Sequence, residues 1–195
     1  MGNGGDGDDR MYGQDGDDGF YGGPGDDLLS GNGGDDYLDG GQGDDTLTGG
    51  DSGTGFFGDR LLGGEGNDRL ESGPGLVDLL GADSANETGN DVMVAEAADT
   101  SVVGGSGNDH IVVEAGRALI VGGTGDDTII GGAENDIIRG EEGNDTLSGN
   151  GGGDVVDGGP GVDALSGGPG TDRCDGGPDT PDTADATCET VIGVP

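Results

Sequence analysis

Residues 22–48 read GGPGDDLLS, GNGGDDYLD and GGQGDDTLT, which are three consecutive copies of one nine-residue pattern. With few departures each copy follows G-G-x-G-x-D-x-U-x, in which U is a large apolar residue and x varies. A fixed period of this kind indicates a repeat architecture, in which every copy contributes the same short unit and stacks on its neighbours. The organisation of the chain therefore depends on how far the pattern extends.

The pattern continues in both directions from this stretch. Eighteen blocks in one register occupy residues 4–175, and two of them are five residues too long, with insertions near 51–58 and 82–88. The places within a block are called positions one to nine, and the blocks are numbered along the chain from residue 4. The sequence predicts a repeat domain over residues 1–175 and a C-terminal capping tail over residues 176–195.

The composition alone favours a disordered chain. Of 195 residues, 52 are glycine and 28% are hydrophobic, and 42 acidic residues against six arginines give a net charge of −36. Few large apolar side chains and a high net charge are typical of intrinsic disorder. The scattered arginines exclude a basic patch for nucleic acid or anionic membrane, and no apolar run approaches the ~20 residues of a membrane span. No signal peptide is visible at MGNGGDGDDR.

The repeat supplies the order that the composition lacks. Glycine in the turn permits positive φ and close backbone approach, and the apolar segment that follows suits a short β-strand. Because two blocks make one coil, strands should stack in parallel ~4.8 Å apart in two facing sheets. We expect an all-β fold, a right-handed parallel β-roll, with position eight as its core. The residues at position eight are Met11, Phe20, Leu29, Leu38, Leu47, Leu61, Leu70, Leu79, Met93, Val102, Ile111, Ile120, Ile129, Ile138, Leu147, Val156, Leu165 and Cys174.

The pattern resembles the RTX (repeats-in-toxin, hemolysin-type calcium-binding) nonapeptide repeat, and the resemblance covers nearly the whole chain. In that family the position-six aspartate is the principal side-chain ligand of calcium, an ion that prefers carboxylate and carbonyl oxygens. The alternative, that these aspartates only favour turns, explains neither the single register nor the carboxylate at the same place each time. The calcium ligands that the resemblance implies are Asp9, Asp18, Asp27, Asp36, Asp45, Asp59, Asp68, Asp91, Asp109, Asp127, Asp136, Asp145, Asp154, Asp163 and Asp172.

Three blocks keep the apolar core position but lack the carboxylate. Val77, Thr100 and Ala118 stand at position six of blocks eight, ten and twelve, which are all even-numbered and therefore lie on the same edge of the predicted coil. We predict one edge with a nearly continuous row of calcium ions and an opposite row that is interrupted between about residues 72 and 121. On this map roughly a dozen Ca²⁺ ions bind, and their charge offsets much of the negative charge of the chain.

The central blocks also carry apolar residues at position nine, which points outward. These ladders could stabilise strands where calcium is absent. They could instead form a patch that docks a protein partner, a second copy of the chain, or the insertion that contains Phe56 and Phe57. The apolar position-nine residues are Leu62, Leu80, Val94, Val103, Val112, Val121 and Ile130.

The register is expected to fail after Asp175, because Pro181 stands where the next aspartate belongs and proline disfavours further strand stacking. Cys174 at a core position and Cys188 in the tail either form a disulfide that pins the tail over the open end of the coil or remain free thiols. An even number of cysteines in an extracellular chain favours the disulfide. The Cys-closed tail resembles RTX-repeat proteins of actinobacterial type.

The sequence thus predicts a secreted, extracellular calcium-binding repeat protein or module that folds when calcium binds, at ~0.1–1 mM as is typical of extracellular modules. It indicates no enzyme, because His110 is the only histidine and no pair of carboxylates stands out among so many. One alternative is an accessory or secretion module at the C-terminus of an extracellular enzyme or toxin. Another is an ice-binding or adhesion solenoid.

Overall fold

The computed structural model describes residues 1–51, 58–81, 89–96, 99–179 and 181–193, and of residues 76–80 it describes the backbone only. Phe56 and Phe57, which the sequence analysis considers as a cover for the apolar residues, lie outside the described residues. The regular elements within the described ranges are all β-strands. No helix long and apolar enough to cross a membrane occurs among them.

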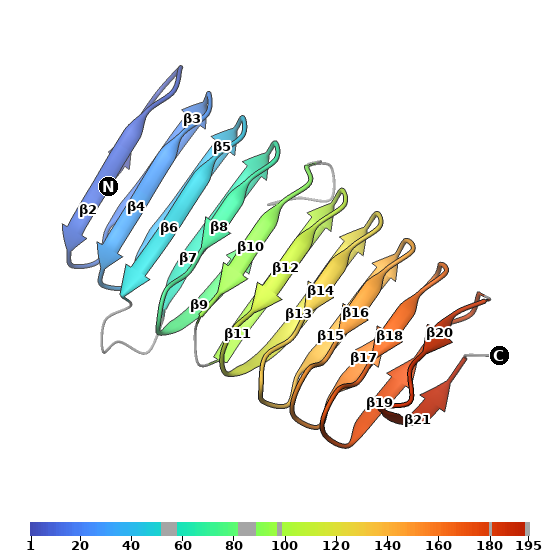
Figure 1. Ribbon diagram of the computed structural model, residues 1–195. Coiled ribbons are helices and arrows are strands. Elements are labelled where there is room, and N and C mark those ends of the chain that lie inside the picture. Colours follow the sequence, from blue (N-terminus) through green and yellow to red (C-terminus); the bar gives the residue numbers. More distant parts are fainter. Residues whose placement is uncertain (52–57, 82–88, 97–98, 180, 194–195) are drawn as a thin grey trace.

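The strands alternate along the chain between two sheets, which we call sheet A and sheet B, and they stack into an elongated roll with the two termini at opposite ends (Figure 1). In spatial order, sheet A contains β1 (Gly2–Asn3), β3 (Gly19–Pro24), β5 (Tyr37–Gln42), β7 (Asp59–Glu65), β9 (Leu76–Leu80), β11 (Asp99–Ser106), β13 (Arg117–Thr124), β15 (Ile137–Glu142), β17 (Val155–Asp157), β19 (Asp172–Asp175) and β21 (Cys188–Ile192). Sheet B contains β2 (Arg10–Asp15), β4 (Leu28–Gly33), β6 (Thr46–Asp51), β8 (Arg69–Glu71), β10 (Val92–Ala95), β12 (His110–Val113), β14 (Thr128–Ile130), β16 (Thr146–Ser148), β18 (Ala164–Ser166) and β20 (Thr183–Ala184).

The strand register follows the nine-residue blocks. Neighbouring strands pair in parallel, and position eight of one coil lies beside position eight of the next, as in Leu29↔Leu47 and Ile120↔Ile138. The register persists across the first insertion, where Leu38 pairs with Leu61. Two blocks per coil with parallel neighbours are the predicted arrangement, so the all-β parallel β-roll is confirmed.

The core lies between the two sheets and consists mainly of position eight. Because successive side chains of a strand point to opposite faces, one residue per strand fills the narrow interior. Met11 and Phe20, in the first coil, are partly buried against this core. The fully buried position-eight residues are Leu29, Leu38, Leu47, Leu61, Leu70, Met93, Val102, Ile111, Ile120, Ile129, Ile138, Leu147, Val156, Leu165 and Cys174.

The C-terminal tail continues the roll, so the expectation that Pro181 ends strand stacking is wrong. Strand β20 pairs with β18 through Leu165↔Ala184, and β21 pairs with β19. The physical reason is a single extra residue in this turn, which places Asp182 at position six and leaves Pro181 before the strand, where no ladder hydrogen bond is required of it.

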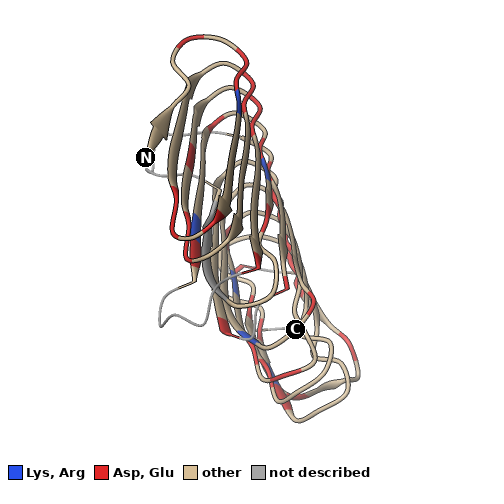
Figure 2. Ribbon diagram, turned by 90° about the vertical axis from the view of Figure 1, so that its left-hand side faces the viewer, with Lys and Arg blue, Asp and Glu red and all other residues tan. Residues whose placement is uncertain are grey.

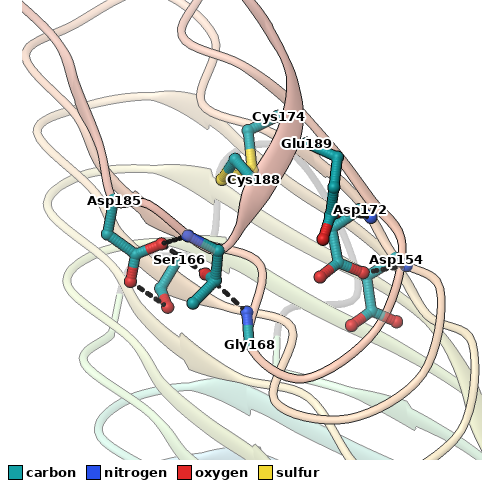
Figure 3. Close-up of a disulfide and its surroundings, with 9 residues drawn as sticks. Asp154, Ser166, Gly168, Asp172, Cys174, Asp185, Cys188 and Glu189 are labelled. Carbon is teal, nitrogen blue, oxygen red and sulfur yellow. Dashed lines mark hydrogen bonds between the residues drawn. A yellow bond between two sulfur atoms is a disulfide. The ribbon is translucent and has the colours of Figure 1, made fainter.

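A disulfide joins the last two strands of sheet A (Figure 3). It links Cys174 in β19 to Cys188 in β21, with the two Cα atoms 5.8 Å apart. Cys174 occupies the core position of its block and is fully buried. The cross-link therefore fastens the tail to the end of the hydrophobic core.

Candidate metal sites

The position-six carboxylates form a ladder along one edge of the roll. We call this the Asp9 edge; it comprises the turns of the odd-numbered blocks, which lead into sheet B. Asp27 Oδ1 accepts the backbone N–H of Asp9 at 2.7 Å, and Asp127 Oδ1 accepts that of Asp109 at 2.8 Å. The same bond recurs in every coil from Asp9 to Asp182, with N···O distances between 2.7 and 3.0 Å. One carboxylate oxygen of each residue is thus used to hold the coils together.

The other carboxylate oxygen, Oδ2, is buried in most position-six aspartates of both edges and in Asp182, and has no hydrogen-bond partner among the described residues. A buried polar atom without a partner is costly, and more so when it carries charge, so each of these oxygens requires a proton or a cation. The residues with such an Oδ2 are Asp9, Asp27, Asp36, Asp45, Asp109, Asp127, Asp145, Asp154, Asp163, Asp172 and Asp182.

Glycine at position one leaves the space into which this oxygen points. A Cβ added to Gly4 would lie 2.5 Å from Asp9 Oδ2 and 2.8 Å from the carbonyl oxygen of Gly22 in the next coil. A Cβ on Gly149 would likewise meet Asp154 Oδ2 and would lie 2.7 Å from the carbonyl oxygen of Gly167. A carboxylate oxygen and a main-chain carbonyl oxygen therefore face the same point in most of these turns. These are the oxygen types that calcium prefers.

Positions one and six vary together along the chain. Every block with aspartate at position six has glycine at position one, whereas the blocks that carry Val77, Thr100 and Ala118 begin with Ser72, Ala95 and Val113. Any side chain at position one would collide with the carboxylate of its own block. The covariation is visible in the repeat, but the sequence does not give its reason, because the two positions face each other only once the turn is folded.

Burial raises the pKa of the position-six carboxyls. Desolvation is the largest cause, and neighbouring carboxylates in the ladder add to it at Asp45, Asp91 and Asp127. The pKa of Asp91 rises to about 8 and those of Asp45 and Asp127 to about 7. Backbone hydrogen bonds oppose these shifts only in part. The pKa rises to about 6 for Asp109, Asp145 and Asp154.

The opposite edge, which we call the Asp18 edge, comprises the turns of the even-numbered blocks that lead into sheet A. Its ladder runs from Asp18 through Asp36 to Asp59 and resumes where Ala118 donates its N–H to Asp136. Between these two parts of the ladder, the residues at positions five and six of blocks eight, ten and twelve belong to strands β9, β11 and β13. Thr100 pairs in register with Val77 on one side and with Ala118 on the other. The carboxylate ladder is thus interrupted where position six is apolar or threonine, and regular strand pairing replaces it.

Asp136 differs from the other predicted ligands. Its Oδ1 accepts the N–H of Ala118 at 2.7 Å, and its Oδ2 accepts the N–H of Gly132 at 2.8 Å. Glu134 occupies position four of this block, where most blocks have glycine. Both oxygens of Asp136 are therefore engaged by backbone donors, and this turn resembles its interrupted neighbours more than the carboxylate turns.

The tail adds two acidic residues that the sequence analysis misses. Asp182 Oδ1 accepts the N–H of Asp163 at 3.0 Å, and Glu189 accepts the N–H of Asp172 (Figure 3). A Cβ on Gly176 would lie 2.8 Å from Asp182 Oδ2, which is the same arrangement as in the regular blocks. The signal in the sequence is GGPDTPD, a turn that is one residue longer than the consensus.

A second, exposed ladder runs beside the first on the Asp9 edge. Here the position-five side chain accepts the N–H of position five in the following coil, as Asp44 does from Asn67 at 2.8 Å and Asn90 from Asn108 at 2.7 Å. The bonds from Asn67 lower the pKa of Asp44. Position five therefore links the coils in the direction opposite to position six.

Acidic residues recur coil after coil along the edges of the roll (Figure 2). Even so, no group of three or more His, Cys, Asp or Glu side chains among the described residues converges on one point. A metal ion in these turns would therefore take at most two of these side chains and complete its shell with backbone carbonyls. That donor set fits calcium, which binds carbonyl oxygens readily, and does not fit zinc, which prefers cysteine and histidine.

Comparison with known families decides the identity of the repeats. The family model of the RTX calcium-binding nonapeptide repeat (four copies) matches residues 3–29, 21–52, 54–75, 87–120, 114–147, 121–156 and 148–180. The chain belongs to this family. Its repeats are calcium-binding repeats, and the roll is a structural calcium-binding unit of a kind that is not typically catalytic and is typically extracellular. A search of curated proteins finds no match.

The apolar position-nine residues of this RTX chain do not form one surface. Val103 and Val121 lie on sheet A, whereas Val94, Val112 and Ile130 lie on sheet B. Leu62 is 1% exposed and is not available to a partner. The side chain of Leu80 lies outside the described part of the chain. Among the described side chains in the middle of sheet A, the most exposed apolar ones are Leu119 in β13 and Ile137 in β15, register neighbours at position seven that the sequence does not single out.

Proposed function

We propose that calcium binding drives the folding of this roll, with the position-six carboxylates as the side-chain ligands. The observation that carries the proposal is the repeated buried Oδ2 without a hydrogen-bond partner, which faces a main-chain carbonyl oxygen in the same turn. The ligand set is the predicted one without Asp136, whose oxygens are both engaged, and with Asp182 added.

Electrostatics supports the coupling of binding to folding. Carboxylates one strand spacing apart, ~4.8 Å, repel each other by on the order of 3 kcal/mol at an effective dielectric constant near 20. This repulsion repeats along each ladder and acts on groups that burial already disfavours in the ionised form. A divalent cation between the turns removes both penalties, so the binding free energy becomes folding free energy.

Circular dichroism in calcium and in chelator tests this proposal. We expect a β-sheet spectrum in millimolar calcium and a largely disordered spectrum after chelation. Magnesium is the matched control, because its small octahedral shell does not suit irregular carbonyl turns, so it should not restore the β signal. A full β signal in excess chelator would overturn calcium-coupled folding.

We further propose that the folding switch operates outside the cell. The disulfide between Cys174 and Cys188 belongs to an oxidising compartment, and extracellular calcium modules bind their ion at ~0.1–1 mM. A folding midpoint in this range would leave the chain unfolded at cytosolic calcium and folded after release. A midpoint below about 1 µM, in the range of intracellular calcium sensors and buffers, would contradict the extracellular assignment.

We also propose that two copies of the chain associate through the outer face of sheet A. Leu119 and Ile137 are 42% and 43% exposed and lie side by side on β13 and β15. Arg117 and Arg139 on the same strands lessen the negative charge around them. Light scattering of Leu119→Ser/Ile137→Ser should show a lower mass than the wild-type chain, whereas Val162→Ser, at an exposed turn, should not. A monomeric wild-type chain at high concentration would refute this contact.

A further inference from the structure

The central coils have a wider apolar core than the rest of the roll. Ala95, Val113 and Ala118 are 0%, 2% and 3% exposed and join the continuous core cluster. They occupy positions one and six on the Asp18 edge, where other coils have glycine and a buried aspartate. In these coils small apolar residues, together with the buried neutral Thr100, therefore stand in place of a carboxylate that requires a cation.

In sheet A the same coils have the longest strands of the described residues. Strands β11 and β13 each contain eight residues and pair in register from Asp99↔Arg117 to Ser106↔Thr124, whereas β10, β12 and β14 in sheet B contain four, four and three. Strands β16, β17 and β18 contain three residues each. Longer pairing in sheet A adds main-chain hydrogen bonds that need no ion, so the central coils gain stability without calcium relative to the C-terminal coils.

The calcium requirement of the central coils is correspondingly lower. On the Asp18 edge their turns hold Thr100 and Ala118; Val77 stands at the turn before them, and at the turn after them backbone N–H groups engage the carboxylate of Asp136. On the Asp9 edge they keep one carboxylate per coil. Each central coil therefore has about half as many carboxylates to neutralise as a coil near either end.

We propose that the central coils, β10 to β14, become ordered at a lower calcium concentration than the coils on either side and act as the nucleus of the roll. In a solenoid each coil contacts only its neighbours, so order spreads from the coil with the highest intrinsic stability. Calcium then extends the roll from β10–β14 toward both ends. The proposal rests on calcium-coupled folding but concerns the order in which the coils form.

Hydrogen exchange measured by mass spectrometry over a calcium titration tests this order. Peptides within residues 92–130 should become protected at a calcium midpoint several-fold below that of peptides within residues 10–50 and 137–175. A single midpoint for all peptides, or earlier protection next to the disulfide, would overturn the proposal. Protection that does not depend on calcium anywhere would instead refute calcium-coupled folding itself, so the two failures are distinguishable.

Two single substitutions in the central coils sharpen the test. Ala118→Asp in β13 places a carboxylate inside the roll, and it should raise the central midpoint to that of the outer coils or above. His110→Asp in β12 adds the same charge at an exposed residue on the outer face and should leave the central midpoint below that of the outer coils. An unchanged central midpoint in Ala118→Asp would contradict the proposal.

A double substitution covers the case in which Ala118→Asp does not fold. Val113→Gly/Ala118→Asp restores both members of the glycine and aspartate pair found in the carboxylate turns. This variant should fold at saturating calcium, bind more calcium than the wild-type chain, and lose the early ordering of residues 92–130. Early ordering that persists in the double variant would overturn the assignment of the nucleus to the apolar turns.

Discussion

The smallest functional unit of this RTX roll is a pair of residues in one block. Glycine at position one admits the Oδ2 of the aspartate at position six, and in the three blocks without the aspartate the glycine is replaced as well. The requirement for glycine is steric, because φ at Gly4 and Gly131 is not in the left-handed region. The carboxylate and the space that it occupies are therefore specified together.

Gly167→Ala tests the steric pairing. A Cβ at this residue would lie 2.6 Å from Asp172 Oδ2, so the carboxylate has to move. We expect a loss of stability of about 1–3 kcal/mol, typical of overpacking, together with weaker calcium binding. Urea unfolding in saturating calcium and a calcium titration measure the two effects. Gly151→Ala is the control, because the nearest atom to its Cβ would be 3.5 Å away, and equal effects in both variants would contradict the pairing.

Glu141 is a residue at which the chain departs from the ideal turn. It stands at position two with φ of 73°, a left-handed conformation in which glycine is common and a residue with a Cβ is strained. Glu141→Gly should stabilise the calcium-bound roll by about 1 kcal/mol, measured by chemical denaturation. Glu142→Gly removes the same charge at a residue without positive φ and should not stabilise the roll. A gain in both variants would point to charge relief instead of backbone strain.

At the scale of strands and turns, the nine-residue period is sufficient to predict most of the fold. Alternation within each block predicts that position eight is buried, as at Leu47 and Ile129, and the period of two blocks per coil predicts parallel pairing. The same periodicity places the position-six carboxylates at the turns. These features follow from local steric rules that repeat in every block.

The features that the sequence does not predict depend on what lies opposite a residue. A single extra residue before Asp182 hides the last turn of the ladder from a strict nine-residue register. The occupied oxygens of Asp136 depend on the path of a turn that lacks glycine at position four. Leu62 shares its position with residues that remain partly exposed, yet it is buried. The period fixes the side of a strand on which a residue lies, but not its surroundings.

The last element, the Cys-linked tail, should stabilise the C-terminal coils. The disulfide closes a loop between residues 14 apart, for which the loss of chain entropy in the unfolded state corresponds to about 3 kcal/mol. Cys174→Val/Cys188→Ser keeps the core position apolar and should lose stability of that order, with faster hydrogen exchange in β17 to β21. Reduction of the wild-type chain should produce the same change. Unaltered exchange near the C-terminus would show that the strand pairing of the tail is sufficient.

At the scale of the whole molecule, the net charge of −36 determines how pH and calcium act together. The buried ladder carboxyls have a raised pKa in the roll, up to about 8 at Asp91. In the unfolded chain their pKa is near ~3.9. A raised pKa means that the calcium-free roll is favoured by protonation. Its stability is fully present below about pH 4 and is lost as the pH rises through 6 to 8.

We therefore expect acidification from pH 8 to pH 5 to increase the β content of the calcium-free chain and to weaken calcium binding, since protons and calcium compete for the same oxygens. Circular dichroism in metal-free buffer follows the first effect, and calorimetry in buffers of different ionisation enthalpy detects proton release on binding. Asp44→Asn is the control, because Asp44 is exposed and its pKa is lowered. Calcium affinity that is constant over this range would contradict the competition.

Because glycine and aspartate occur together, the residues at positions one and six of a block identify the type of turn that the block forms. Positions one and six of a block together form either a turn proposed to bind calcium, as with Gly122 and Asp127, or an apolar turn, as with Val113 and Ala118. Both kinds of turn occur along the Asp18 edge, where a backbone N–H bonded to an aspartate Oδ1 joins the coils at the carboxylate turns and strand pairing joins them at the others. Changing the two residues together in a chosen block would change where along the roll calcium binds, while the fold of the roll stays the same.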